Sequence, residues 1–431
     1  MVDVGTHHFV KSSPKSDRVL VPQPSDNPHD PLNWSTFWKF STLTCATAVT
    51  FVQGMGPLSL APMFPHLIEA FDSNLTDVVQ FTGVAILVLG FSNFIWVPLS
   101  TSFGRRPVYL ASTLICFGSA IWRARAQSYG SFMGACVLNG LAAGPAETIQ
   151  PNVIADMMFL HERGLYQTLY FAFYFGSLII GPIIAGPMAE YSGWRNFWWL
   201  NVAMIGTTFI MCLFGFPETK WHRVHPDEMR RAVSKPQASS SGEKAADETI
   251  EGSDMENAGS NGTSDLAQTA TAARDPYLGK GRPSKQQFKF FQSNAHPFKS
   301  ILLDLWIPWK LFAFPIVEFA SFVVSWSASS FLTINLTQSQ AFTAPPYNFS
   351  SLTVGLFNFA MLIGAIIGLL TAGPFSDWIS MVLTRRNKGV REPEMRLPTM
   401  IPYVIFMIVG NFIVAFGYQQ GWNWKVSNSL S

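Results

Sequence analysis

The chain has 431 residues, of which 48% are hydrophobic and only 13% are Asp, Glu, Lys or Arg. Soluble domains carry about 25% charged residues, so this composition excludes an ordinary soluble protein. The net charge of +2 is small, its distribution is more informative than its sum, and no nucleic-acid partner is expected. The four cysteines lie in apolar runs without metal-ligand spacing, so neither a metal site nor a disulfide framework is expected.

Nine long apolar segments follow one another, each close to or above the roughly 20 residues that an α-helix needs to cross a bilayer. The predicted spans are 39–61, 77–99, 107–126, 131–155, 165–189, 196–216, 307–333, 352–373 and 398–418. The polar start of the chain has no cleavable signal pattern, so the first span is expected to direct insertion. The sequence therefore predicts an all-α polytopic membrane protein.

Lys and Arg gather in alternate loops, and positive loops stay on the cytoplasmic side. The N-terminal tail, the loop with Arg105 and Arg106 and the loop 385–396 are basic, whereas the loops after the first and seventh spans have no Lys or Arg. The N-terminus is expected in the cytoplasm, with Arg123 and Arg125 in the third–fourth loop as the exception. The glycosylation sequons expected outside are those at Asn74, Asn335 and Asn348.

A long polar segment separates six spans from the last three. Its stretch Ser234–Lys285 is poor in large apolar residues and is expected to be disordered, because it cannot bury enough apolar surface to fold. The predicted domains are a cytoplasmic tail (1–38), a six-helix bundle (39–216), a cytoplasmic linker (217–305), a partial bundle of three helices (306–418) and a short tail (419–431).

One motif occurs twice. Pro98-Leu-Ser-Thr101-Ser-Phe-Gly104-Arg105-Arg106 follows the second span, and Gly373-Pro374-Phe-Ser376-Asp377-Trp378, with Arg385-Arg386 behind it, follows the eighth. Two parallel halves joined by a cytoplasmic loop are the arrangement of the major facilitator fold. Three further motifs occur in order: Asp30-Pro-Leu-Asn-Trp34-Ser, Asn139-Gly-Leu-Ala-Ala-Gly-Pro-Ala-Glu147 and Pro217-Glu-Thr-Lys220. On these residues the chain resembles the major facilitator superfamily, specifically its fungal proton-coupled drug-efflux carriers.

The resemblance implies twelve helices in two halves of six. The N-terminal half would be complete and the C-terminal half incomplete, since Gly421-Trp-Asn-Trp424-Lys425-Val426 reads as the entry to a tenth helix; a C-terminal truncation is therefore expected. The resemblance also implies export, because the fifth span is similar to the antiporter motif at Gly176, Gly181, Pro182, Gly186 and Pro187. The chain departs from the family at Val97 and Thr101, where Gly and Asp are usual, and at Cys136, where an Arg often stands.

Two carboxylates are predicted near the middle of the membrane. Glu147 lies nine residues before Asp156, which is expected near the cytoplasmic end of its helix, so it would be about 13 Å deep. Glu318 lies about a dozen residues into the seventh span. Ionisable side chains are costly there and are functional candidates, and apolar surroundings favour their protonated form. Each is a candidate for coupling to protons or a cationic substrate; the alternative is a protonated glutamate that only bonds helices together.

The basic motif predicts a second functional feature. A cytoplasmic charge latch that breaks as the halves rock would use Arg105, Arg106, Asp156, Asp377 and Arg385. The alternative is that these charges only set the topology. The glycines of the fifth span fit either a gating role or close packing of small residues.

The sequence favours a monomeric secondary transporter without cofactors. It would export a small, largely apolar organic molecule, such as a secondary metabolite, toxin or drug, across the plasma membrane by proton antiport. No Gly-x4-Gly-Lys-Ser/Thr loop is present, which argues against an ATP-driven pump, and no supported catalytic grouping indicates an enzyme. The alternatives are uptake of a nutrient or polyamine, and a truncated membrane protein that does not transport.

Overall fold

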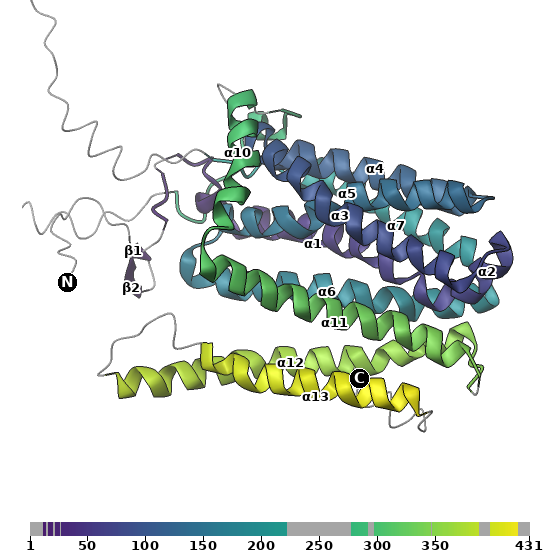
Figure 1. Ribbon diagram of the computed structural model, residues 1–431. Helices are drawn as coiled ribbons and strands as arrows, with labels where there is room; N and C mark the ends of the chain where they lie inside the picture. Colours follow the sequence, from purple (N-terminus) through teal and green to yellow (C-terminus); the bar gives the residue numbers. More distant parts are fainter. Residues whose placement is uncertain are drawn as a thin grey trace, which may run out of the picture.

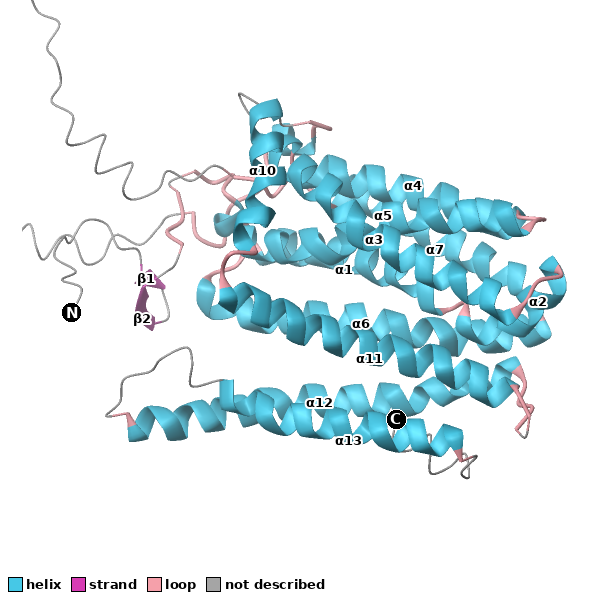
Figure 2. Ribbon diagram, viewed as in Figure 1, coloured by secondary structure: helices cyan, strands magenta, loops and turns pink. Residues whose placement is uncertain are grey.

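The structure is a computed structural model that describes residues 12–13, 16–19, 22–25, 27–221, 277–291, 297–345, 347–387 and 397–420. Helices dominate these residues, and their one sheet is the antiparallel pair β1 (Ser12–Ser13) and β2 (Ser16–Val19) (Figure 1, Figure 2). The predicted disorder of 234–276 and the predicted tail from 421 onward lie outside the described residues.

Six long helices form the N-terminal bundle. In chain order they are α1 (Thr36–Leu58), α3 (Leu75–Phe103), α4 (Arg105–Arg125), α5 (Tyr129–Met157), α6 (Leu160–Tyr191) and α7 (Trp194–Gly215). The short helix η1 (Pro31–Asn33) precedes α1, and η2 (Ala61–Met63) and α2 (Phe64–Phe71) follow it. The six predicted spans of this half are confirmed as helices, with ends that differ by a few residues.

The second part of the chain differs more from the prediction. It contains η3 (Lys285–Phe288), α10 (Pro297–Leu311), α11 (Pro315–Thr343), α12 (Ser351–Arg386) and α13 (Met400–Gln419). The predicted continuous span 307–333 is wrong, because the helix breaks before Pro315; proline disfavours a helical conformation in the residue before it and starts a new helix well. The span predicted to end at 373 continues unbroken to Arg386.

Among the residues that the structure describes, seven helical stretches are long and apolar enough to cross a membrane by length and composition. They are Thr36–Phe71, Leu75–Phe103, Leu160–Tyr191, Trp194–Gly215, Pro315–Thr343, Ser351–Arg386 and Leu397–Gln419. The prediction of nine such spans was too high on this criterion. The two that fall outside it, α4 and α5, are less apolar, since α4 carries four arginines and α5 is rich in small and polar residues. They pack within the same bundle (Figure 1).

The two halves meet at the end of the bundle where α6 ends and α12 begins, called here the closed end. Ser339 of α11 donates a hydrogen bond to the carbonyl oxygen of Ala61, and Ser351 Oγ lies 3.2 Å from His66 Nδ1. Beyond Met361, α12 is no longer covered by α6, since residues 363–375 of α12 are exposed. The opposite end, where α3 passes into α4 at Gly104, is called here the motif end.

Part of the predicted linker is folded at the motif end. The backbone of Gly281 donates to Asn33 O and accepts from Ser35 N, both at 2.9 Å, and Gln287 Nε2 donates to His29 O at 3.0 Å. The prediction of disorder was therefore wrong for 277–285. Pairing with the turn ahead of α1 orders this segment, and composition does not reveal such pairing.

Candidate functional site

Glu218 organises the charges at the motif end. Its carboxylate accepts hydrogen bonds from the backbone N–H groups of Arg105 (2.9 Å) and Arg106 (3.0 Å), which are the first residues of α4. An acidic group at a helix N-terminus satisfies free N–H groups and complements the helix dipole. The side chain is 1% exposed. Its motif in the sequence predicted no role for Glu218, because its partners lie more than a hundred residues away.

Three of the five predicted latch residues, Arg105, Arg106 and Asp156, lie here, and the ion pair and hydrogen bonds described next lie within the N-terminal half. Arg105 Nε lies 3.3 Å from Asp156 Oδ2, an ion pair between α4 and α5. Arg106 is buried and donates to the carbonyl oxygens of Phe216 and Leu213 at the end of α7. Contacts with α10 are made by the end of α3, where Thr101 donates to the carboxylate of Asp304 and Ser102 donates to the carbonyl oxygen of Pro297.

Lys220 completes this cluster. Its ammonium donates to the carbonyl oxygens of Thr101 and Ser102 at the end of α3. Burial lowers the pKa of the Lys220 ammonium, and the positive charge of nearby Arg105 lowers it further. Backbone carbonyl oxygens and the carboxylate of Asp156 thus bind the three positive side chains of the motif end, those of Arg105, Arg106 and Lys220.

The second copy of the motif is built differently. Asp377 and Arg385 both lie on α12, which has no break comparable to Gly104. Gly104 adopts a φ of +109°, which ends α3 and starts α4. Asp377 and Arg385 are both exposed. Eight residues of helix separate them by about 12 Å, so they do not form the equivalent of the Arg105–Asp156 pair.

Glu147 is half-buried on α5, the helix that also carries Asp156. Tyr174 of α6 donates to its carboxylate at 3.4 Å, and Tyr170 of α6 donates to its backbone oxygen at 2.6 Å. Asn93 of α3 neighbours the carboxylate and also accepts a hydrogen bond from Thr148 at 3.1 Å. One ionisable group therefore contacts side chains of two other helices.

Contrary to the prediction, Glu318 does not lie near the middle of a span. It is in the first turn of α11 and is exposed. The break before Pro315 moves it from the expected middle of a span to a helix end. There its charge complements the N-terminal end of the helix dipole.

The glycines of the antiporter-like motif differ from one another. A Cβ on Gly181 would lie 2.7 Å from Met55 O of α1, and one on Gly186 would lie 3.0 Å from the Cα of Gly355 on α12. A Cβ on Gly176 would meet nothing within 4 Å. Pro182 and Pro187 lie within α6 without ending it. Gly181 and Gly186 thus permit close helix packing, and Gly186 does so between the two halves.

The three sequons also separate. Asn74 and Asn348 are exposed near the closed end. Asn335 is 3% exposed inside α11, and its Nδ2 donates to Asn358 of α12 at 2.9 Å. The prediction of a glycan at Asn335 is therefore wrong, because its helix extends through the expected loop as far as Thr343.

Arg123 is the residue that sequence reasoning misplaced most clearly. It was expected in a loop, but it lies within α4 with a side chain that is 0% exposed. Its guanidinium lies over the ring of Trp198 on α7, 4.6 Å from the centroid. Arg125, two residues further on, is exposed and lies over Trp199 at 5.9 Å.

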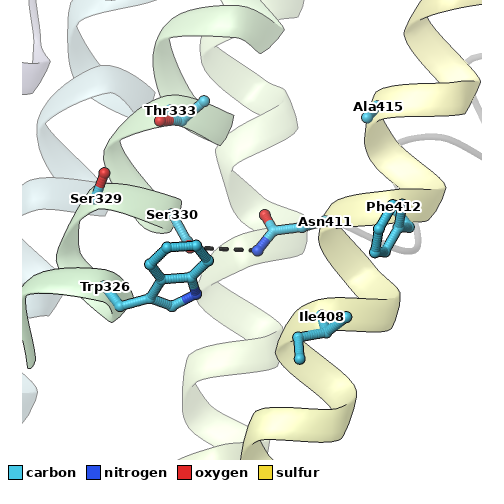
Figure 3. A pocket seen from close by; sticks show the side chains of 8 residues that line it. All are labelled: Trp326, Ser329, Ser330, Thr333, Ile408, Asn411, Phe412 and Ala415. Atoms are coloured by element: carbon cyan, nitrogen blue, oxygen red, sulfur yellow. Dashed lines mark hydrogen bonds between the residues drawn. The ribbon is translucent and has the colours of Figure 1, made fainter. Parts of the chain in front are cut away.

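A hollow of about 430 Å³ lies between α11 and α13 (Figure 3). Its lining residues are Trp326, Ser329, Ser330, Thr333, Ile408, Asn411, Phe412 and Ala415. Asn411 Nδ2 donates to Ser330 Oγ at 3.2 Å across it. The lining is mainly apolar with a few hydroxyl and amide groups, a composition typical of sites for small organic molecules.

Comparisons with known proteins agree with this architecture. The family model described as Major Facilitator Superfamily matches residues 46–426. An uncharacterized MFS-type transporter of Schizosaccharomyces pombe is 26% identical over 421 residues, covering 95% of this chain and 72% of that protein. The efflux pump FUB11 of Gibberella fujikuroi is 26% identical over 372 residues, covering 84% of this chain and 55% of that protein. A crystal structure of a peptide transporter POT in complex with alafosfalin matches with a TM-score of 0.50 and 12% identity, covering 90% of this chain and 78% of that one.

Proposed function

Because the chain belongs to the major facilitator superfamily, we propose that this transporter exports a small organic molecule while protons move inward. The observation that carries the proton-coupling proposal is Glu147, an ionisable side chain inside the bundle that contacts α3 and α6. Export is supported by the similarity to the efflux pump FUB11 and by the glycine and proline motif of α6. We propose that the protein lies in the plasma membrane, with the motif end and the N-terminus on the cytoplasmic side.

The proton would act through α6. A charged Glu147 only accepts hydrogen bonds, whereas a protonated one also donates, so protonation changes what the hydroxyl group of Tyr174 meets. The same helix carries Gly186, which packs against Gly355 of α12 at the closed end. Protonation of Glu147 would thereby shift the conformational equilibrium of α6, the helix that contacts both this carboxylate and the C-terminal half. This is the two-state element that alternating access needs.

The proposed substrate is small and largely apolar. The hollow between α11 and α13 offers Trp326 and Phe412 for apolar contact and the Ser330–Asn411 pair for hydrogen bonding. Glu318 is a second coupling candidate at the motif end of α11. Asp377 and Arg385 are proposed to belong to the cytoplasmic charge latch, and the functional unit is proposed to be a monomer.

Transport into inside-out membrane vesicles tests this proposal. The vesicles would carry the parent chain, Glu147→Gln or Glu318→Gln, and vesicles with FUB11 would be the transport control. A panel of labelled apolar compounds would be added outside vesicles whose lumen is more acidic than the medium. The expected result is pH-driven accumulation by the parent that falls to background in Glu147→Gln at equal protein abundance. If Glu318→Gln alone abolishes accumulation, the coupling site is on α11. Loss of label from preloaded vesicles would identify uptake, and a parent that moves no compound would refute transport.

A further inference from the structure

Arg123 places a full positive charge inside the N-terminal bundle. Its side chain is 0% exposed, and Trp198 covers one face of the guanidinium. A Cβ on Gly56 of α1 would lie 3.3 Å from Arg123 Nη1 and 3.4 Å from Asn139 Oδ1 of α5. The group is therefore enclosed by α1, α4, α5 and α7. Since a helical side chain leans toward the N-terminus of its helix, the guanidinium points from the closed end into the bundle.

Among the described residues this guanidinium has no charged acceptor. Nε, Nη1 and Nη2 donate no hydrogen bond to an oxygen atom there, and none of the described carboxylates forms an ion pair with it. The thiol of Cys136 is a neighbour, but a thiol is a weak, neutral acceptor. Asn139 Oδ1 accepts no hydrogen bond either, and an amide would not balance the charge.

Arg106, the other buried arginine of α4, has the oxygen acceptors that Arg123 lacks among the described residues. It is 3% exposed, donates to the carbonyl oxygens of Leu213 and Phe216, and lies beside the carboxylate of Glu218. Arginine keeps its charge in proteins, and a cation–π contact offsets only part of the cost of removing that charge from water. On this comparison Arg123 lacks a negative partner.

The neighbouring face of α7 adds more donors without acceptors. Trp198 Nε1 and Asn201 Nδ2, one helical turn apart, are buried and unbonded. We propose that Arg123, with Trp198 and Asn139 beside it, forms an occluded site for a small monovalent anion. A halide ion and the carboxylate of a small organic acid share the required charge and size. The proposal does not depend on transport, because it concerns binding to the folded chain.

The test is thermal unfolding of the purified full chain in detergent at constant ionic strength. Gluconate, a much bulkier anion, would be replaced stepwise by chloride, bromide or acetate. A ligand that binds only the folded state raises the midpoint in a saturable manner. The parent should show this rise, Arg125→Gln should keep it as the matched control on the same helix, and Arg123→Gln should lose it.

A charge-complementing variant covers the case in which Arg123→Gln does not fold. Asn139→Asp would supply a carboxylate beside the guanidinium, so it should raise the midpoint in gluconate and abolish the response to added anions. A response to halides alone or to acetate alone supports the site and identifies the anion. A parent without a saturable response, or an Arg123→Gln variant that keeps the full response, would overturn the proposal.

Discussion

Replacing Gly186 by alanine tests whether backbone contact between α6 and α12 holds the closed end. The added Cβ would lie 2.5 Å from Ser351 O and 3.0 Å from the Cα of Gly355, whereas ordinary contacts are 3.4 Å or longer. Both neighbours are backbone atoms, so the helices must separate by about 1 Å. Overpacking of this kind costs about 1–3 kcal/mol. The closed arrangement should therefore lose roughly 5- to 150-fold in population relative to the open one.

Labelling of a single introduced cysteine measures that shift. Ala61 is 2% exposed and accepts the hydrogen bond from Ser339 across the closed end, so Ala61→Cys reports its opening. The four native cysteines are buried and give a low background. A membrane-impermeant maleimide should react faster when Gly186→Ala is added, but not when Gly176→Ala is added, because a Cβ there meets nothing within 4 Å. Equal labelling of the two variants would refute the reasoning.

Three further predictions concern the two ends of the molecule. Gly104 has a φ of +109°, and a Cβ there would lie 2.8 Å from Glu218 Cδ, so Gly104→Ala should lower the free energy of unfolding by about 3 kcal/mol or more. Chemical unfolding measures this loss, with Gly118→Ala, whose Cβ would meet open space, as the control; a Gly104→Ala variant as stable as Gly118→Ala would contradict the prediction. In a glycosylating host, Asn335→Gln should leave gel mobility unchanged, whereas a glycosidase-sensitive band that disappears in this variant would contradict its burial. Folding lowers the pKa of Lys220, so the unfolded chain binds more protons than the folded chain as the pH approaches 10.5, and thermal stability should rise with pH over that range. The rise should be smaller in Lys220→Met; an equal rise in the parent and the variant would contradict the lowered pKa of Lys220.

Long apolar runs predicted the helices of the N-terminal bundle well. The ends of α7 lie within a few residues of the prediction, because an uninterrupted apolar run defines this helix. Counting along the chain put Glu147 and Asp156 on one helix, and both lie on α5. Such features depend on local sequence, and local sequence was sufficient for them.

Features that depend on distant contacts were not predicted. Glu218, which follows the C-terminal end of α7, caps the N-terminus of α4. Asp304 accepts a hydrogen bond from Thr101, about two hundred residues earlier in the sequence. The depth of Glu318 was wrong because a proline break inside an apolar run does not change its mean hydropathy. Arg123 was assigned to a loop because its charge was counted without the aromatic ring that covers it. For Glu218, Asp304 and Arg123 the deciding contact is with a distant segment of the chain, whereas for Glu318 it is the nearby Pro315.

The proton flux that accompanies substrate movement tests the central claim most directly. Purified parent chain and Glu147→Gln would be reconstituted into vesicles that contain a pH-sensitive dye, and substrate would be added without a pre-formed pH gradient. The account predicts a substrate-dependent proton movement in the opposite direction for the parent, and none for Glu147→Gln with substrate binding retained. An undiminished proton movement in Glu147→Gln would contradict it.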